Sequence, residues 1–119
     1  MQVVDAYFVG YESARPIFDA LCSAIAEFGP CEMRVTTSQI AFRRRVGFAW
    51  AWVPARYLRV QVAPLVLTLA LRRRDGSPRW KEVVEPTPGR FTHHLELNSI
   101  NDIDAAVYGW LREAWAEAE

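Results

Sequence analysis

The sequence predicts an α+β fold in which N-terminal and C-terminal helices pack on one face of a mainly antiparallel sheet, in two layers. Three observations predict it: apolar residues recur with a helical period near both ends, alternate with a period of two in between, and turn signals separate the alternating segments. With 119 residues, 51% of them apolar, we expect a single domain over 1–119. The uncovered sheet face must then be solvated or used for binding.

The N-terminal part is predicted to be helical. A short turn or helix over 3–8 precedes a longer helix over 14–28, which Ser13 is expected to cap and Gly29 with Pro30 to end. Its apolar stripe consists of Ile17, Leu21, Ile25 and Phe28.

The period then changes to two, which predicts strands. They are expected over 31–36, 40–43, 48–53, 65–71, 80–85 and 90–97. The segment 54–63 fits either a strand or a loop, because Leu58, Val60 and Val62 alternate but prolines bracket them.

The last two strands are expected to form a hairpin around the turn 86–89. A four-residue loop predicts a register with opposite charges at two positions. The predicted pairs are Glu85 with Arg90, Val84 with Phe91, Glu82 with His93, and Arg79 with Glu96.

A final helix is predicted over 102–117, capped by Ser99 or Asn101 and with Asp102 and Asp104 near its positive end. The residues expected to face inward are Ile103, Val107, Trp110, Leu111 and Ala114.

Charge is segregated along the chain although it sums to zero. Residues 34–81 hold eleven of the fourteen Lys and Arg but only one acid, Asp75, whereas the rest holds three basic and thirteen acidic residues. The basic region is a candidate anion-binding surface, and the acidic remainder is a candidate counter-surface.

Two arginine triplets are the sharpest candidates for an anion site. Each follows a predicted strand, so several guanidinium groups would converge on a phosphate. The alternative is that they are solvated charges that protect sheet edges from aggregation. The triplets are Arg43, Arg44, Arg45 and Arg72, Arg73, Arg74.

Large aromatics are expected to share one face of the strand over 48–53. Phe48, Trp50 and Trp52 fit a core under the helices, and the alternatives are a dimer interface or a platform on which a ligand stacks.

His93 and His94 are adjacent in a strand and so are expected on opposite faces. His93 is predicted to face the core, bonded to Glu82 or to backbone, and His94 to lie on the polar face. A partly buried polar pocket of Glu82 and His93 would offer an acid and a base, but no nucleophile, oxyanion donor or metal set completes a catalytic site.

Several stretches spread over most of the chain form a recognisable pattern. They are Tyr7-Phe8-Val9-Gly10, Phe28-Gly29-Pro30, Val35-Thr36 to Phe42, Phe48-Ala49-Trp50, Ser77-Pro78-Arg79, Gly89-Arg90-Phe91-Thr92-His93-His94 and Trp110-Leu111-Arg112-Glu113-Ala114. This pattern resembles an uncharacterised, mostly bacterial family, the domain of unknown function numbered fifty-six fifty-five, which is sometimes labelled "predicted transport protein". The resemblance implies no activity. The final aromatic-His strand and acid-capped helix are also similar to YjbR-like double-wing domains, for which DNA binding has been suggested.

The sequence lacks the motifs of several functional classes of protein. Cys22 and Cys31 lack metal-site or redox spacing and fit reduced core thiols, and no nucleotide or hydrolase motif occurs, so no cofactor or metal is expected. Without a signal peptide or an apolar span, a cytoplasmic protein with no membrane partner is expected. We expect a small binding module for an anionic ligand or nucleic acid, or alternatively a self-associating structural or regulatory domain, with catalysis the least favoured.

Overall fold

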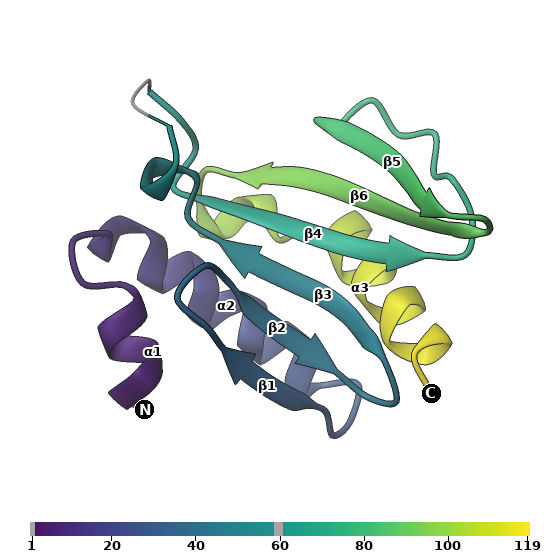
Figure 1. Ribbon diagram of the computed structural model, residues 1–119, viewed down its shortest axis with the longest axis horizontal. Coiled ribbons are helices and arrows are strands. Elements are labelled where there is room, and N and C mark those ends of the chain that lie inside the picture. Colours follow the sequence, from purple (N-terminus) through teal and green to yellow (C-terminus); the bar gives the residue numbers. More distant parts are fainter. Residues whose placement is uncertain (1, 59–60) are drawn as a thin grey trace.

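The computed structural model describes residues 2–58 and 61–119, and Figure 1 shows its elements. The α+β class is confirmed. The helices are α1 (Gln2–Tyr7), α2 (Arg15–Ala26) and α3 (Ala105–Glu117), with short 3-10 turns at Glu12–Ala14, Pro54–Arg56 and Ile100–Asp102. The strands are β1 (Glu32–Val35), β2 (Ile40–Arg43), β3 (Gly47–Trp52), β4 (Leu65–Leu71), β5 (Glu82–Thr87) and β6 (Arg90–Leu97).

The strands form one antiparallel sheet in the order β1-β2-β3-β4-β6-β5. Figure 1 views the sheet from its uncovered side, with α2 and α3 behind it and α1 beside the β1 edge. The predicted arrangement, with helices from both ends of the chain on one sheet face, is therefore confirmed. We call the sheet face turned away from α2 and α3 the open face.

The central strand β4 is buried along its whole length. Leu67 and Leu69 point toward the helices and pair across the sheet with Ala51 and Ala49 of β3, which are also fully buried. Small residues on this side of β3 leave room for the helices to approach the sheet, while the intervening positions face the open side.

Both predicted helix caps are wrong. Ser13 lies inside a 3-10 turn and α2 begins after it at Arg15, with no side-chain cap. At the other end, a 3-10 turn precedes α3, and Asp104 caps the helix by accepting a hydrogen bond from Val107 N at 3.1 Å. Asp104 also places its charge at the positive end of the helix dipole.

Phe48 does not share a face with Trp50 and Trp52. A bulge between Phe42 and Arg43 pairs Arg43 with Gly47, so Phe48 is an additional residue in β3. Phe48 and Ala49 both enter the core, whereas Trp50 and Trp52 reach the open face. The expectation of a core position is thus correct for Phe48 and wrong for the two tryptophans.

The predicted hairpin register is also wrong. Thr87 pairs with Arg90 across a two-residue turn, and Gly89 takes the positive φ of 76° that such a turn requires. A bulge between Val84 and Thr87 then places Glu82 opposite His94 instead of His93. Pro86 lies in this bulge, where its missing N–H costs no ladder bond.

The segment 54–63 contains a 3-10 turn and, among its described residues, no strand. Val60, one of the three residues of the predicted alternation, lies outside the described residues.

Candidate functional site

One row of side chains crosses the open face through all six strands. Its members are cross-strand neighbours, so each lies within about 5 Å of the next at Cβ. In spatial order they are Arg34, Ala41, Trp50, Thr68, His94 and Glu82. The row runs from Arg34 on edge strand β1, through aromatic and polar residues, to Glu82 on edge strand β5.

The Trp50 ring lies against the backbone of Gly47. A Cβ built on Gly47 would be 2.8 Å from Cζ2 of Trp50, so a residue with a side chain at this position would displace the ring. Arg43 pairs with Gly47 across the sheet, and Arg90 donates from Nη2 to the Gly47 carbonyl at 2.8 Å. Both arginines therefore lie beside Gly47, the residue on which the Trp50 ring packs.

A hydrogen-bonded chain joins Trp52, Thr68 and His94 in the middle of the face. Trp52 Nε1 donates to Thr68 Oγ1 at 3.1 Å, and Thr68 Oγ1 lies 2.8 Å from His94 Nδ1. Thr68 is only 7% exposed. The chain fixes the orientation of both rings relative to the central strand.

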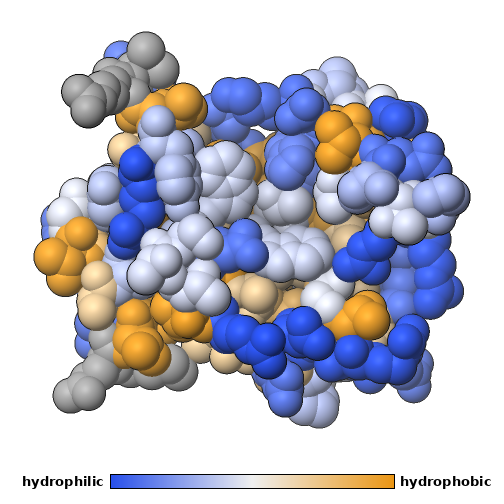
Figure 2. Space-filling view, in the orientation of Figure 1, coloured by the Kyte–Doolittle hydropathy of each residue, from blue (hydrophilic) through white to orange (hydrophobic). Residues whose placement is uncertain are grey.

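Two neighbouring hollows meet at Trp52 and His94. The first, which we call the aromatic hollow, measures about 410 Å³ and includes Trp50, Trp52, Tyr57, Thr68, Thr92 and His94 in its lining. The second, which we call the acidic hollow, measures about 310 Å³ and includes Trp52, Leu58, Val66, Glu82, His94 and Glu96. Figure 2 shows this side of the molecule, with pale aromatic rings at the centre of a hollowed surface and blue hydrophilic groups around it.

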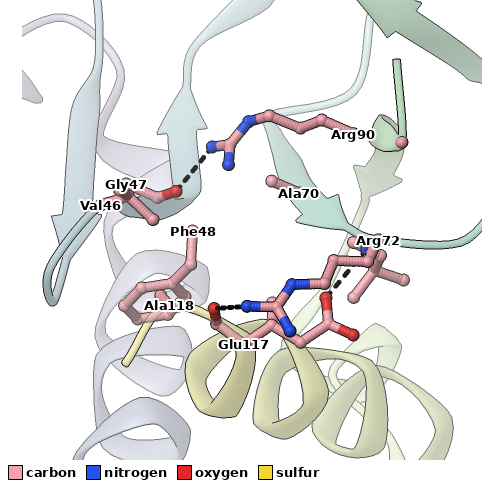
Figure 3. Close-up of a pocket in the computed structure, with 11 residues that line it drawn as sticks. Val46, Gly47, Phe48, Ala70, Arg72, Arg90, Glu117 and Ala118 are labelled. Atoms are coloured by element: carbon pink, nitrogen blue, oxygen red, sulfur yellow. Dashed lines mark hydrogen bonds between the residues drawn. The ribbon is translucent and has the colours of Figure 1, made fainter. Parts of the chain in front are cut away.

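A narrower cleft of about 260 Å³ opens where β3 and β4 separate beyond Ala49 and Leu69. In Figure 3, Arg90 reaches across it to Gly47, and Arg72 donates from its backbone N–H and from Nη2 to Glu117, both at 2.9 Å. These polar groups are bonded to one another, so the cleft is a seam between the sheet and the end of α3.

The arginine triplets largely serve the C-terminal end of α3. Arg44 donates to the Trp115 carbonyl at 2.9 Å and stacks 3.7 Å from the Trp115 ring centre. Arg45 donates to the carbonyl of Glu119 at 3.0 Å. Cations at this end of a helix stabilise it by satisfying its last carbonyl groups and opposing its dipole.

The second triplet is engaged in a similar way. Arg73 forms ion pairs with Glu113 and Asp75, both at 2.8 Å, and the Arg74 guanidinium lies 5.4 Å from the centre of the Phe91 ring. Much of the segregated charge is thus paired within the chain, because the basic loops meet the acidic helix. Arg43, in contrast, lies in strand β2 and pairs with Gly47 across the sheet.

Glu82 and His93 do not form a common pocket, since they lie on opposite faces of the sheet. His93 is fully buried, as predicted, and of its two predicted kinds of partner, Glu82 or backbone, it has backbone groups. Its Nε2 accepts from Asp75 N at 3.0 Å and its Nδ1 lies 3.1 Å from the Phe91 carbonyl. Burial lowers the pKa of His93 because it disfavours the charged ring.

Asp75 anchors the loop above His93. Burial alone would raise its pKa, but hydrogen bonds from Trp80 Nε1, Ser77 N and the Arg73 guanidinium outweigh this effect and lower the pKa to about 2. The carboxylate is therefore charged at neutral pH and holds the loop in place.

Neither cysteine has the properties of a reactive thiol. Burial raises the pKa of Cys31, and it raises that of Cys22 to about 12.

Across residues 2–58 and 61–119, no group of three His, Cys, Asp or Glu side chains is placed to hold a metal ion. Within the same ranges, no helix has the length and apolar character needed to cross a membrane.

The family model described as "Domain of unknown function (DUF5655)" matches residues 4–118. The chain belongs to this family. Comparison with curated proteins and with solved structures gives no match. The family assignment confirms the resemblance seen in the sequence and adds no activity, so the site has to be interpreted from its own geometry.

Sequence reasoning did not find Thr68, Tyr57 or the role of His94 as parts of one site. A signal for Thr68 was present, since it is the one polar residue in the strand Leu65–Leu71. Tyr57 gave none, because its place beside Trp52, with ring centres 6.3 Å apart, depends on how the loop after β3 folds back.

Proposed function

We propose that the open face binds single-stranded nucleic acid, with bases stacked on Trp50 and Trp52 and phosphates held by the adjacent arginines. The observation that carries the proposal is the half-buried Trp50 ring, which lies on Gly47, the residue that pairs with Arg43 and accepts a hydrogen bond from Arg90. An aromatic ring with arginines on a neighbouring residue suits a base followed by its phosphate.

The dimensions of the strand fit this use. Trp50 and Trp52 are two residues apart on β3, which separates them by roughly 7 Å and gives each room for a separate base. Stacking of a base on an aromatic side chain contributes roughly 1–3 kcal/mol and depends little on base identity.

Arg34 extends the basic side of the face. It is exposed on edge strand β1, in the same cross-sheet row as Trp50. Among the described residues, Arg34 and Arg43 take part in no ion pair. We therefore assign phosphate binding to Arg34, Arg43 and Arg90, and a structural role at α3 to Arg44, Arg45, Arg72 and Arg73.

Binding of a fluorescent single-stranded oligonucleotide, measured by anisotropy over a salt series, tests the proposal. Affinity is expected to fall with added salt, with a slope of about −0.7 per phosphate contact on a logarithmic plot. Arg43→Gln and Arg90→Gln should each weaken binding and make the slope shallower by about that amount, and Trp50→Ala should weaken binding with the slope kept.

Arg112→Gln is the matched control, because Arg112 is exposed on α3 in the opposite layer and the charge change is the same. Equal losses in Arg43→Gln and Arg112→Gln would show attraction to the overall charge without a site on the open face. No binding at low salt would overturn the proposal.

Self-association is the alternative, and one observation favours it. Tyr57 and Leu58, 55% and 48% exposed, lie beside the hollows and offer apolar area to a second copy. The internal pairing of the arginine triplets leaves less charge for such a contact, so a dimer of this kind would tolerate salt. Light scattering over a concentration and salt series tests it, and a monomer under all conditions would exclude it.

A further inference from the structure

The hydrogen-bond chain on the open face favours one tautomer of His94. An indole N–H can only donate, so Thr68 Oγ1 accepts from Trp52. When Thr68 uses its single proton within the chain, the acceptor among the described residues is His94 Nδ1, which lies 2.8 Å from Oγ1. In this arrangement neutral His94 carries its proton on Nε2 and is a donor there.

An acceptor lies beside this donor. Glu82 is exposed on β5, directly opposite His94, and both line the acidic hollow. Within residues 2–58 and 61–119, no hydrogen bond or ion pair engages the Glu82 carboxylate, whereas Glu96 is paired with Lys81 at 3.2 Å. A carboxylate has two oxygens and can accept two parallel hydrogen bonds.

Trp52 provides a wall for both hollows, so a strand stacked on the aromatic hollow continues into the acidic one. The volume of about 310 Å³ is at the lower end of the range for small-ligand sites. Because His94 and Glu82 both line this hollow, a base in it would meet these two side chains.

We infer that the acidic hollow selects guanine. Guanine offers two adjacent donors, N1–H and the exocyclic amino group, to the two oxygens of Glu82, and it offers O6 to the His94 N–H. The pairing edges of adenine, cytosine and thymine do not present two adjacent donors beside an acceptor. This inference rests on the proposed function, because the phosphates and the stacked neighbours of the base hold the strand.

Oligonucleotides of equal length and charge test the inference. The probes are an eleven-residue thymidine strand and the same strand with one central guanine or one central hypoxanthine, which lacks the amino group. The guanine strand is expected to bind roughly tenfold more tightly than the thymidine strand, within the discrimination that a good bidentate base contact gives. The hypoxanthine strand should lose most of this advantage.

Glu82→Gln should reduce the ratio of guanine-strand to thymidine-strand affinity to near one, because an amide has only one acceptor oxygen. Glu32→Gln is the matched control, since Glu32 is exposed on β1 at the other edge of the sheet, and it should keep the preference. Equal binding of all three strands by the unmodified protein, or a preference that survives in Glu82→Gln, would overturn the inference and leave the proposed function standing. Failure to bind any strand would overturn both.

Discussion

The hydroxyl oxygen of Thr68 lies 2.8 Å from Nδ1 of His94 and also accepts the indole N–H of Trp52 at 3.1 Å. A polar side chain in a central, buried strand costs free energy unless it is hydrogen-bonded. Thr68 meets this condition by joining two rings that line the hollows. The same contact therefore explains why a threonine is tolerated in the core strand and why the open face has a defined shape.

Thr68→Val is expected to destabilise the fold by about 1 kcal/mol, since it leaves Trp52 Nε1 and His94 Nδ1 without their partner and hardly changes the volume. Chemical denaturation measures this loss, and nitrogen NMR of His94 should show the proton no longer confined to Nε2. Thr92→Val is the control on the same face. The Thr92 hydroxyl has one long hydrogen bond of 3.5 Å, so a change below about 0.5 kcal/mol is expected. Equal losses in the two variants would contradict the assigned role of Thr68.

His93→Ala is expected to lower the free energy of unfolding by roughly 1–3 kcal/mol, because it removes a buried ring. The backbone N–H of Asp75 and the carbonyl of Phe91 would then lose the hydrogen-bond partners that the two His93 nitrogens provide. His94→Ala, on the open face, should cost less, about 1 kcal/mol or below, through the lost Thr68 contact. Urea denaturation of both variants checks the order. A His94→Ala protein less stable than His93→Ala would contradict the observed partners.

The burial of His93 predicts that the stability of the fold depends on pH. Burial lowers the pKa of folded His93, so at intermediate pH the unfolded chain binds more protons at this position. The stabilising contribution is complete above the unfolded pKa of about 6.5 and is lost as the pH falls from there through the folded value. Urea denaturation at several pH values should show a steeper loss below about pH 6.5 in the unmodified protein than in His93→Gln. Parallel curves would contradict the prediction.

Arg44→Ala is expected to cost about 1–2 kcal/mol, because the side chain both donates to the Trp115 carbonyl and stacks on the Trp115 ring. The stability of Arg44→Lys should lie between that of the unmodified protein and that of Arg44→Ala, because an ammonium group keeps the charge but cannot stack as a planar guanidinium does. Arg34→Ala, at an exposed edge position, is the control and should stay within about 0.5 kcal/mol. Thermal unfolding distinguishes the three variants, and an Arg44→Ala protein as stable as Arg34→Ala would refute the anchoring role.

The class of fold and most strands could be predicted from periodicity because both depend on which residues must be buried. The position of each tryptophan could not, because the bulge at Phe42 and Arg43 adds a residue to β3 and changes the face of Phe48 relative to Trp50. The alternation of apolar and polar residues along a strand does not reveal where one extra residue has been inserted. The predicted hairpin register was wrong for two reasons: the turn has two residues instead of four, and a second bulge shifts the pairing by one residue, so that Glu82 lies opposite His94.

The arginine triplets illustrate a different limit. Their position after strands was predicted, but their partners lie on α3, which is far away in the sequence and reaches Arg44 and Arg72 only through the packing of the two layers. Local sequence shows that charges are clustered, and it does not show whether the chain itself neutralises them. The sequence therefore placed the candidate site in the loops that carry the arginine triplets, whereas in the structure the candidate site lies on the open face.

Gly47→Ala tests whether the placement of Trp50 matters for binding. The added Cβ would lie 2.8 Å from Cζ2 of Trp50, and the ring would have to shift away from the Gly47 backbone. The Trp50 ring is partly exposed and free to move outward, so folding stability should change by less than about 1 kcal/mol. Oligonucleotide affinity should nevertheless fall roughly threefold to tenfold, a part of the energy of one stacked base.

Gly76→Ala is the matched control for this substitution, because a Cβ there meets no atom within 4 Å. Anisotropy measures the affinity of both variants, and tryptophan fluorescence should change in Gly47→Ala alone. If Gly47→Ala altered the fluorescence and kept full affinity, the orientation of Trp50 would be irrelevant to binding. The bases would then have to stack elsewhere on the open face, against Trp52 and Tyr57.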